Sequence, residues 1–151
     1  MTPLPHHYAV HLSGASRDYA DVSSLGLPPL RLAAPSDFDG PGDAWSPEHL
    51  LLAAVEGCLL LTFRAVAKAS QLPFVRLDVE TAGIVDTQDG VVRFTEIVMR
   101  PRLTVPEGTD HARALRVLER SEKACLVSAS LATPIRLEAT IASVAPAGAA
   151  G

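Results

Sequence analysis

The stretch SPEHLLLAAVEGCLLLTFRAVAKAS, residues 46–70, is a long apolar run that predicts a buried helix. Ser46 is a favourable N-cap, Pro47 suits the first helical position, and Glu48 complements the positive end of the helix dipole. Apolar residues cover nearly every side of this helix, so it is expected to be buried all round. A helix wrapped so completely needs more cover than 151 residues easily supply, which suggests a partner subunit.

The composition is that of one soluble, ordered domain. Hydrophobic residues make up 48% of the chain and charged residues 20%, as in globular proteins. We expect a single domain over residues 7–144, with flexible ends at 1–6 and 145–151. The net charge of −4 and the lack of a Lys/Arg-rich block argue against binding to nucleic acid or to an anionic membrane surface.

The charged residues of the apolar run also argue against a membrane span. Too many interrupt it for an unbroken hydrophobic segment, namely Glu48, Glu56, Arg64 and Lys68. No basic segment followed by an apolar one opens the chain, so a cytoplasmic protein is expected. Two cysteines in such a chain are more often catalytic, transient or inert than a permanent structural bridge.

The other elements are expected on both sides of the central helix. Short strands are expected at 7–12, 19–25 and 30–33, two longer strands at 74–87 and 91–105, and a last strand at 135–144. Pro101 places the second long strand at a sheet edge or at a bulge. A second, amphipathic helix is expected from Thr109 or Asp110 to about Lys123. This order of strands and helices predicts an α+β fold.

The two cysteines differ in their expected reactivity. Cys58, in the middle of an apolar helix, is most often simply a small core residue. The helix dipole does not reach it and apolar surroundings raise a thiol pKa, so a reactive Cys58 requires a cation from elsewhere in the fold. Cys125 is expected near a helix end, where access is easier. The two could form a redox pair, although their spacing alone does not establish contact.

Four short motifs occur in a fixed order. They are SRD at 16–18, SPEHLL at 46–51, EGC at 56–58 and ACLVS at 124–128. Together with the two cysteines, this ordered set resembles the OsmC/Ohr family of thiol-dependent hydroperoxide reductases, over residues 8–143. The resemblance implies antiparallel sheets wrapped around the long central helix, a second amphipathic helix, and an intertwined homodimer.

The resemblance assigns a role to each of four residues. Cys58 corresponds to the peroxidatic cysteine and Cys125 to the resolving one, while Arg17 corresponds to the catalytic arginine and Glu48 to the glutamate that holds it. Leu126 departs from the family, because many members have proline there. Judged by residue type alone, Arg17 is a solvated turn residue and Glu48 an ordinary first-turn acid.

Three further residues are weaker candidates for the substrate pocket. Trp45 and Phe63 suit an apolar wall for organic peroxides, although core packing explains them equally well. Glu56 is close in sequence to the nucleophile, at a position where small residues are more usual in the family. His6, His7 and His11 lack companion ligands, so no metal site is predicted.

Helix geometry predicts a site shared between two subunits. Ten helical residues separate Glu48 from Cys58 by about 15 Å along the axis, so Glu48 could hardly position an arginine beside the cysteine of its own helix. An antiparallel second copy would bring its Glu48 and Arg17 to this Cys58. Gly57 would permit close approach of the two helices, although it could equally be a packing glycine within one subunit.

The expected function follows from the resemblance. The protein would reduce organic hydroperoxides to alcohols through a Cys58 sulfenic acid and a Cys58–Cys125 disulfide, with an external dithiol, of lipoyl type in the family, as reductant. No bound metal or organic cofactor is expected. The alternatives are a non-enzymatic redox sensor or small-molecule binder on the same dimer, or a structural dimer with inert thiols.

Overall fold

The computed structural model describes residues 3–17 and 19–145. The chain divides into two compact units, Met1–Leu51 and Leu52–Gly151. The expected flexible ends at 1–6 and 145–151 fall partly outside the described residues, and Asp18 of the SRD motif falls outside them too.

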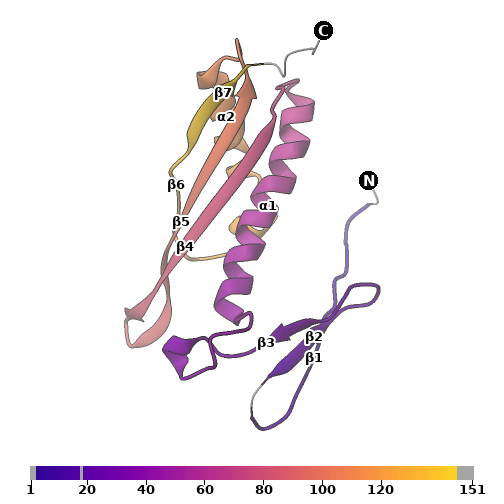
Figure 1. The fold of residues 1–151 in the computed structure, drawn as a ribbon, viewed down its shortest axis with the longest axis vertical. Coiled ribbons are helices and arrows are strands. Elements are labelled where there is room, and N and C mark those ends of the chain that lie inside the picture. The colour runs from indigo at the N-terminus through magenta and orange to yellow at the C-terminus, as the bar shows by residue number, and fades with distance from the viewer. Residues whose placement is uncertain (1–2, 18, 146–151) are drawn as a thin grey trace. The chain divides into compact units, whose positions relative to one another are not determined.

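The N-terminal unit contains a three-stranded antiparallel sheet (Figure 1). Its strands are β1 (His11–Gly14), β2 (Ala20–Ser23) and β3 (Leu30–Leu32), paired in the order β1-β2-β3. The three short strands expected from the sequence are confirmed, although β1 lies further along the chain than 7–12. A 3-10 turn, η1 (Ser36–Phe38), follows, and the N–H of Ala33 donates to the carbonyl of Trp45 at 2.9 Å. This contact ties the loop down just before the central helix.

The central helix α1 spans Pro47–Ala69, 23 residues, close to the expected bounds. Ser46 caps it, because its hydroxyl accepts the N–H of His49 at 3.3 Å and lies 2.8 Å from Nδ1 of the same histidine. The Ser46 side chain is fully buried. Ser46 thus caps the helix, as the sequence predicted.

Burial of α1 is confined to one stripe in the single chain. Its buried residues recur every four positions, at Val55, Leu59, Phe63 and Ala67. The helix has the length and hydropathy of a membrane span, yet only 22% of its most apolar window is buried. The expectation of burial all round is therefore wrong for the isolated chain, since one sheet face and one neighbouring helix cover only one side of a cylinder.

The C-terminal unit is built on a long hairpin. Strands β4 (Arg76–Gln88) and β5 (Val91–Pro106) pair antiparallel, as predicted, and Asp89 and Gly90 both adopt positive φ in the turn between them. Such a turn matches the twist of the two strands. The predicted last strand is divided into β6 (Ile135–Leu137) and β7 (Thr140–Val144), and both run parallel to β5. The sheet is therefore mixed, not antiparallel throughout.

The environment of Pro101 in β5 differs from the one predicted from the sequence. The strand is central in its sheet and the only register shift lies at Ile84/Val85, so neither the predicted edge nor a bulge occurs at Pro101 within the described residues. On its second side, β5 pairs with β6 through Met99 and with β7 from Arg102 onward. Pro101 falls between these two partners, where the ladder is interrupted and a missing N–H is tolerated.

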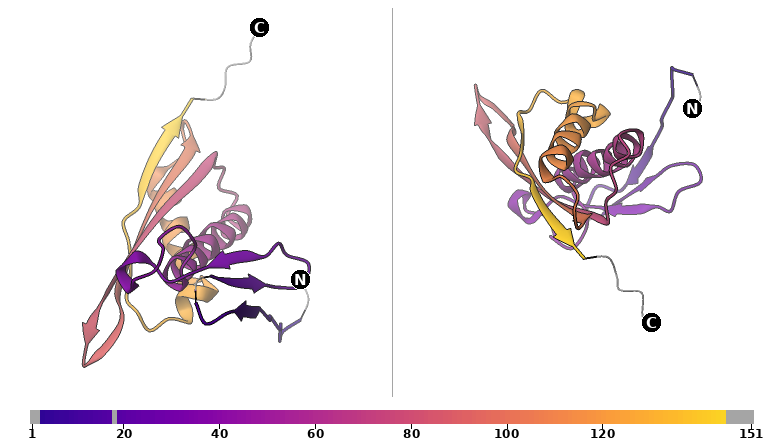
Figure 2. Two further views of the ribbon diagram at one scale, coloured as in Figure 1. Left: turned by 60° about the horizontal axis from the view of Figure 1, so that its bottom comes forward. Right: turned by 90° about the horizontal axis from the view of Figure 1, so that it is seen from above.

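Two helices lie with α1 on one face of this sheet (Figure 2). The amphipathic helix α2 (His111–Lys123) begins at Asp110, whose carboxylate accepts the N–H groups of Ala112 and Arg113. A short helix, α3 (Leu126–Ala129), which the sequence did not predict, has Cys125 as its N-cap. Between helices and sheet lies one apolar core of Val55, Leu59, Phe63, Ala67, Leu72, Leu77, Met99, Leu103, Val105, Ala114, Val117 and Leu118.

Candidate active site

Cys58 and Cys125 lie against each other in the C-terminal unit. Cys58 comes from the middle of α1 and is partly exposed, whereas Cys125, at the start of α3, is fully buried. The thiol of Cys125 is hydrogen-bonded to the sulfur of Cys58. The fold therefore brings together two cysteines that are 67 positions apart in the sequence. Both are free thiols.

The surroundings of Cys58 favour its thiolate. Burial raises the pKa of Cys58, but hydrogen bonds from Cys125, from the Val127 N–H, from the Thr62 hydroxyl and from the Leu126 N–H together outweigh that effect, so the pKa lies below the ordinary value of a thiol. The Thr62 oxygen lies 3.8 Å from the Cys58 sulfur, one helical turn further along α1. The thiolate is the nucleophilic form of cysteine.

The pKa of Cys125 is shifted in the opposite direction. Burial, the hydrogen bond to Cys58 and the charge on Cys58 raise the pKa of Cys125, and the hydroxyl and N–H of Ser128 offset only part of this rise. The arrangement therefore pairs one sulfur that is easier to deprotonate with one thiol that is harder to deprotonate. Such a difference between two adjacent titratable groups is typical of reactive sites.

No charged side chain of the C-terminal unit is among the groups that act on Cys58. The contributions come from a thiol, a hydroxyl and two backbone amides of the described residues. Cys58 thus lacks, within its unit, the cation that would stabilise its thiolate most strongly.

Arg17 and Glu48 belong to the N-terminal unit. Arg17 is exposed on the turn between β1 and β2 and forms no ion pair with any described residue. Oxygen Oε2 of Glu48 is buried, and no described residue donates a hydrogen bond to it. Glu48 is the one charged residue lining a hollow of about 360 Å³ whose other walls are Ala20, Leu32, Ala33, Ala34, Pro35, Phe38 and Pro47. A buried carboxylate oxygen without a donor is costly.

The three weaker candidates lie in different environments. Phe63 is fully buried and packs edge to face on Phe74 with ring centroids 5.0 Å apart, which favours the core-packing alternative. Trp45 is 48% exposed and lies edge-on to His49. Glu56 is not among the groups that act on Cys58, and at about 100° per helical residue the two side chains point in nearly opposite directions.

Several groups at the thiol pair were missed by the sequence reasoning. Thr62 had a usable signal, because residues four apart share one face of a helix. Ser128 and the N–H groups of Leu126 and Val127 had none, because α3 is too short to leave a periodic pattern. Only the folded chain shows that these groups meet Cys58 or Cys125.

Cys58 also lies on an apolar stripe of α1 that its own unit leaves uncovered. The stripe consists of Ala54, Cys58, Leu61 and Ala65, spaced four, three and four residues apart. Three of its members are exposed, Leu61 to 63%. Beside it, a Cβ added at Gly57 would meet no described atom within 4 Å, so the glycine is not required for packing inside the chain.

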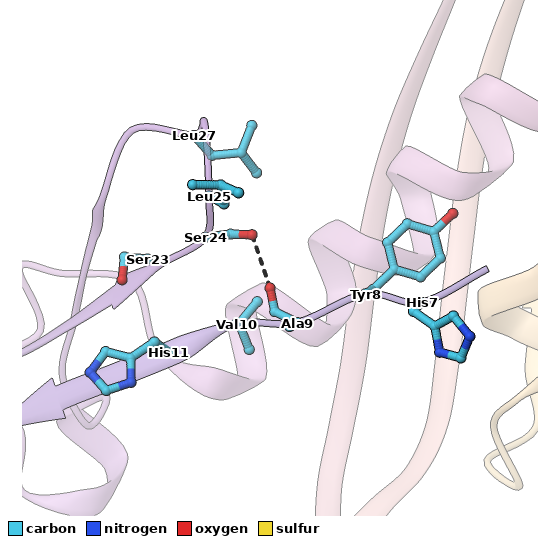
Figure 3. A pocket seen from close by; sticks show the side chains of 9 residues that line it. All are labelled: His7, Tyr8, Ala9, Val10, His11, Ser23, Ser24, Leu25 and Leu27. Carbon is cyan, nitrogen blue, oxygen red and sulfur yellow. Dashed lines mark hydrogen bonds between the residues drawn. The ribbon is translucent and has the colours of Figure 1, made fainter.

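Other features of the described residues do not add to this site. A hollow of about 770 Å³ on the N-terminal unit is lined by residues 7–11 together with Ser23, Ser24, Leu25 and Leu27 (Figure 3). It contains no cysteine and no acidic residue. In the part of the chain that the structure describes, no three His, Cys, Asp or Glu side chains gather as metal ligands would.

Comparison with known proteins gives consistent results. Residues 40–140 match the family model of OsmC-like proteins. A sequence relative, the uncharacterized protein YmaD of Bacillus subtilis (strain 168), is 27% identical over 138 residues, which is 88% of this chain and 91% of that protein. Among solved structures, an OsmC-like protein of unknown function from Vibrio cholerae superposes with a TM-score of 0.81 at 16% identity, covering 90% of this chain and all of that one. An organic hydroperoxide resistance protein from Legionella pneumophila gives 0.73 at 16% identity, covering 93% and 99%.

Proposed function

Because this chain belongs to the family of OsmC-like proteins, we propose that it is a thiol peroxidase that reduces organic hydroperoxides to alcohols. The observation that carries the proposal is the pair of free thiols, in which Cys58 has a lowered pKa and the adjacent Cys125 a raised one. The names of two structural relatives, organic hydroperoxide resistance proteins of Legionella pneumophila and Bacillus subtilis, support the choice of substrate class.

In the first step the Cys58 thiolate attacks the peroxide. Its sulfur forms an S–O bond to the terminal oxygen of ROOH while the O–O bond breaks, and the departing alkoxide takes up a proton to give the alcohol. Cys58 is thereby oxidised by two electrons to the sulfenic acid.

In the second step Cys125 resolves the sulfenic acid. Its sulfur attacks the Cys58 sulfur, an S–S bond forms, the S–O bond breaks, and the hydroxide leaves as water after taking up a proton. The charge on the Cys58 thiolate is one cause of the raised pKa of Cys125. Because a sulfenic acid is neutral at neutral pH, that cause disappears when Cys58 is oxidised, and Cys125 becomes easier to deprotonate when it is needed as a nucleophile.

An external dithiol closes the cycle. Thiol–disulfide exchange through a mixed disulfide returns both cysteines to the reduced state and leaves the dithiol oxidised. We propose a lipoyl-type dithiol, following the family resemblance. The scheme uses only sulfur chemistry of these two residues and needs no bound metal or organic cofactor.

We further propose that a second copy of the chain completes the site. Within the described residues Arg17 has no ion pair and Oε2 of Glu48 has no donor, so the two groups are complementary to each other. An arginine held by Glu48 would bring to Cys58 the cation that its own unit does not supply. At about 4 Å and an effective dielectric constant near 20, such a cation stabilises the thiolate by up to roughly 4 kcal/mol before desolvation is subtracted.

Antiparallel packing of two α1 helices would give this arrangement. For Glu48 of one copy to lie level with Cys58 of the other, the two antiparallel helices must be closest at Ala53, which is midway between these two positions. The residues near that centre are small, Ala53, Ala54 and Gly57, and allow close approach of two helices. The uncovered stripe through Cys58 and Leu61 then provides the apolar surface that the second copy buries.

One experiment tests the peroxidase function. The reduced protein is mixed with one equivalent of cumene hydroperoxide or of hydrogen peroxide, thiol loss is followed by stopped flow, and disulfides are mapped by mass spectrometry. We expect fast formation of a Cys58–Cys125 disulfide with the organic peroxide and much slower reaction with hydrogen peroxide. Cys58→Ser is the matched control and should not react.

Two other outcomes would overturn the proposal. Thiols that stay reduced for minutes in wild-type protein would point to a structural dimer with inert thiols. Rapid oxidation without subsequent reduction by dihydrolipoamide or another dithiol would instead favour a redox sensor. Neither outcome is compatible with a turning-over peroxidase.

A further inference from the structure

We propose that Thr62 is a positioning residue for Cys58, whose hydroxyl donates to the thiolate and directs the sulfur toward α3. The proposal rests on the function proposed above, in which Cys58 is the nucleophile. It concerns a residue that matches none of the four motifs by which the sequence resembles its family.

The contact of Thr62 is unusual for a hydroxyl in a helix. Ser and Thr side chains in helices commonly donate to the carbonyl one turn back. Ser121 in α2 does so, to the carbonyl of Val117 at 2.7 Å, and Ser130, the C-cap of α3, donates in the same way to the carbonyl of Leu126 at 2.9 Å. For Thr62 the recorded partner among the described residues is instead the Cys58 sulfur, 3.8 Å away.

The ionisation state of the sulfur decides which atom donates. Either atom can donate while Cys58 is a thiol. A thiolate carries no proton, so the hydroxyl of Thr62 must then be the donor, and a hydrogen bond to a charged acceptor is stronger than one between neutral groups. Formation of the thiolate thus strengthens the hydrogen bond from Thr62. A group that binds the thiolate more strongly than the thiol lowers the pKa of Cys58.

The geometry around Cys58 also gives Thr62 a directional role. The sulfur is approached from α3 by the Cys125 thiol and by the N–H groups of Leu126 and Val127, and along α1 by the Thr62 hydroxyl. In the proposed dimer Arg17 of the second copy would be the one charged group among these. Because χ1 of cysteine has three staggered positions, a donor on its own helix one turn away helps to select the rotamer that faces Cys125.

The test replaces the hydroxyl without changing the volume of the side chain. Thr62→Val removes the donor, and Thr62→Ser retains it as the rescue variant. The rate of iodoacetamide alkylation of Cys58 is measured by peptide mass spectrometry from pH 4 to pH 10, on the full-length reduced protein without peroxide. We expect the Thr62→Val midpoint to rise by about half a unit to one unit, so that alkylation at pH below both midpoints slows about three- to tenfold.

A matched control acts on the other thiol. Ser128 follows Cys125 by three residues and lowers the pKa of that residue. Ser128→Ala is therefore expected to raise the midpoint of Cys125 and to leave that of Cys58 nearly unchanged. Circular dichroism and size-exclusion chromatography report whether each variant folds and associates as the wild type does.

The outcomes separate this inference from the peroxidase proposal. An unshifted Cys58 midpoint in folded Thr62→Val overturns the role of Thr62, whatever the peroxidase assay shows. A shift in Thr62→Val that Thr62→Ser does not restore also overturns it, because the hydroxyl would then not be the cause. A shift restored by serine supports it, and this holds even if wild-type protein does not turn over peroxide.

Discussion

The thiol of Cys125 is hydrogen-bonded to the sulfur of Cys58, and the pKa values of the two residues are shifted in opposite directions. The donor begins a helix of four residues and the acceptor lies in the middle of one of 23. This contact gives the site an order of events, because the sulfur that loses its proton more easily is the partly exposed one of Cys58 and not the buried one of Cys125.

The pH dependence of thiol reactivity should separate the two cysteines. The pKa of Cys58 is lowered from that of a free thiol, so its thiolate is lost only as the pH falls through this lowered value. The pKa of Cys125 is raised, so its thiolate forms at a higher pH than that of Cys58. Alkylation followed residue by residue should show two separate midpoints, the one of Cys58 lying below the one of Cys125. Equal midpoints would contradict the assignment of donor and acceptor.

Cys125→Ser should uncouple the two chemical steps. Cys58 should still be oxidised by cumene hydroperoxide, but without the second sulfur its sulfenic acid should accumulate and be trapped by dimedone. Turnover with a dithiol should fall at least about tenfold, because the sulfenic acid is open to over-oxidation. Mass spectrometry of the dimedone adduct is the measurement. Undiminished turnover would show that Cys125 does not resolve the intermediate.

Leu126→Pro should weaken the activation of Cys58. Leu126 is the first residue of α3, a position where proline is normally tolerated, and its side chain is 69% exposed. Proline has no backbone N–H, so the substitution removes the Leu126 N–H that lowers the pKa of Cys58. We therefore expect the pKa of Cys58 to rise while the fold is kept. Leu126→Ala, which keeps the N–H, is the matched control. Iodoacetamide kinetics against pH measure both, and identical profiles would exclude a role for this amide.

Hybrid dimers should reveal whether the site is shared. Cys58→Ala and Arg17→Ala are each expected to reduce peroxidase activity strongly when expressed alone. When the two are coexpressed, random pairing makes half of the dimers hybrids, and each hybrid carries one intact shared site, so roughly a quarter of wild-type activity should return. A site formed within one subunit predicts no recovery. Arg17→Ala paired with Glu48→Gln is the control that should stay inactive, since these two residues would serve the same site.

Leu61→Glu should dissociate the proposed dimer without unfolding the subunit. The side chain is 63% exposed in the single chain, so a charge there costs the subunit little, but it would lie in the interface between two α1 helices. Size-exclusion chromatography with light scattering should show a monomer, and circular dichroism should show unchanged helix content. Val75→Glu, at a residue 58% exposed just before β4, is the control and should remain dimeric. A dimeric Leu61→Glu protein would exclude this stripe as the interface.

Gly57→Ala should have opposite effects on the subunit and on the dimer. An added methyl meets no described atom and improves helix propensity, so the free energy of unfolding of the monomeric Leu61→Glu protein should rise by about 1 kcal/mol. In the dimer the same methyl would lie where two backbones approach, and the dissociation constant should increase. Urea denaturation and dilution experiments measure the two effects. Tighter association would contradict close helix packing at this glycine.

The elements with strong local signals could be predicted from the sequence. The cap at Ser46, the long α1, the β4–β5 turn at Asp89 and Gly90, and the cap of α2 at Asp110 all depend on residues close in sequence. The family resemblance also identified the two cysteines that the structure brings together. Local patterns therefore located the central helix, and the resemblance located the two cysteines.

The remaining features depend on long-range pairing and could not be predicted in this way. Residues 135–144 alternate between apolar and polar as a single strand would. In the structure they form two strands, because β6 pairs with β5 before Pro101 and β7 pairs with β5 after it. The donors from α3 to Cys58 lie in a four-residue helix without periodicity. The uncovered stripe of α1 and the buried one both consist of apolar residues, so the apolar pattern alone does not show which of them the chain itself covers.

The parallel pairing of β6 and β7 with β5 has a consequence for how the chain folds. The two strands of the β4–β5 hairpin are adjacent in sequence and can pair early, whereas the other side of β5 is closed by residues 135–144, which are synthesised later. The segment carrying Cys125 is anchored between α2 and β6, so it is fixed only when that final pairing is complete. During synthesis Cys58 is therefore present before Cys125 is fixed beside it, and a Cys58 oxidised in that interval would have no neighbouring thiol with which to form a disulfide.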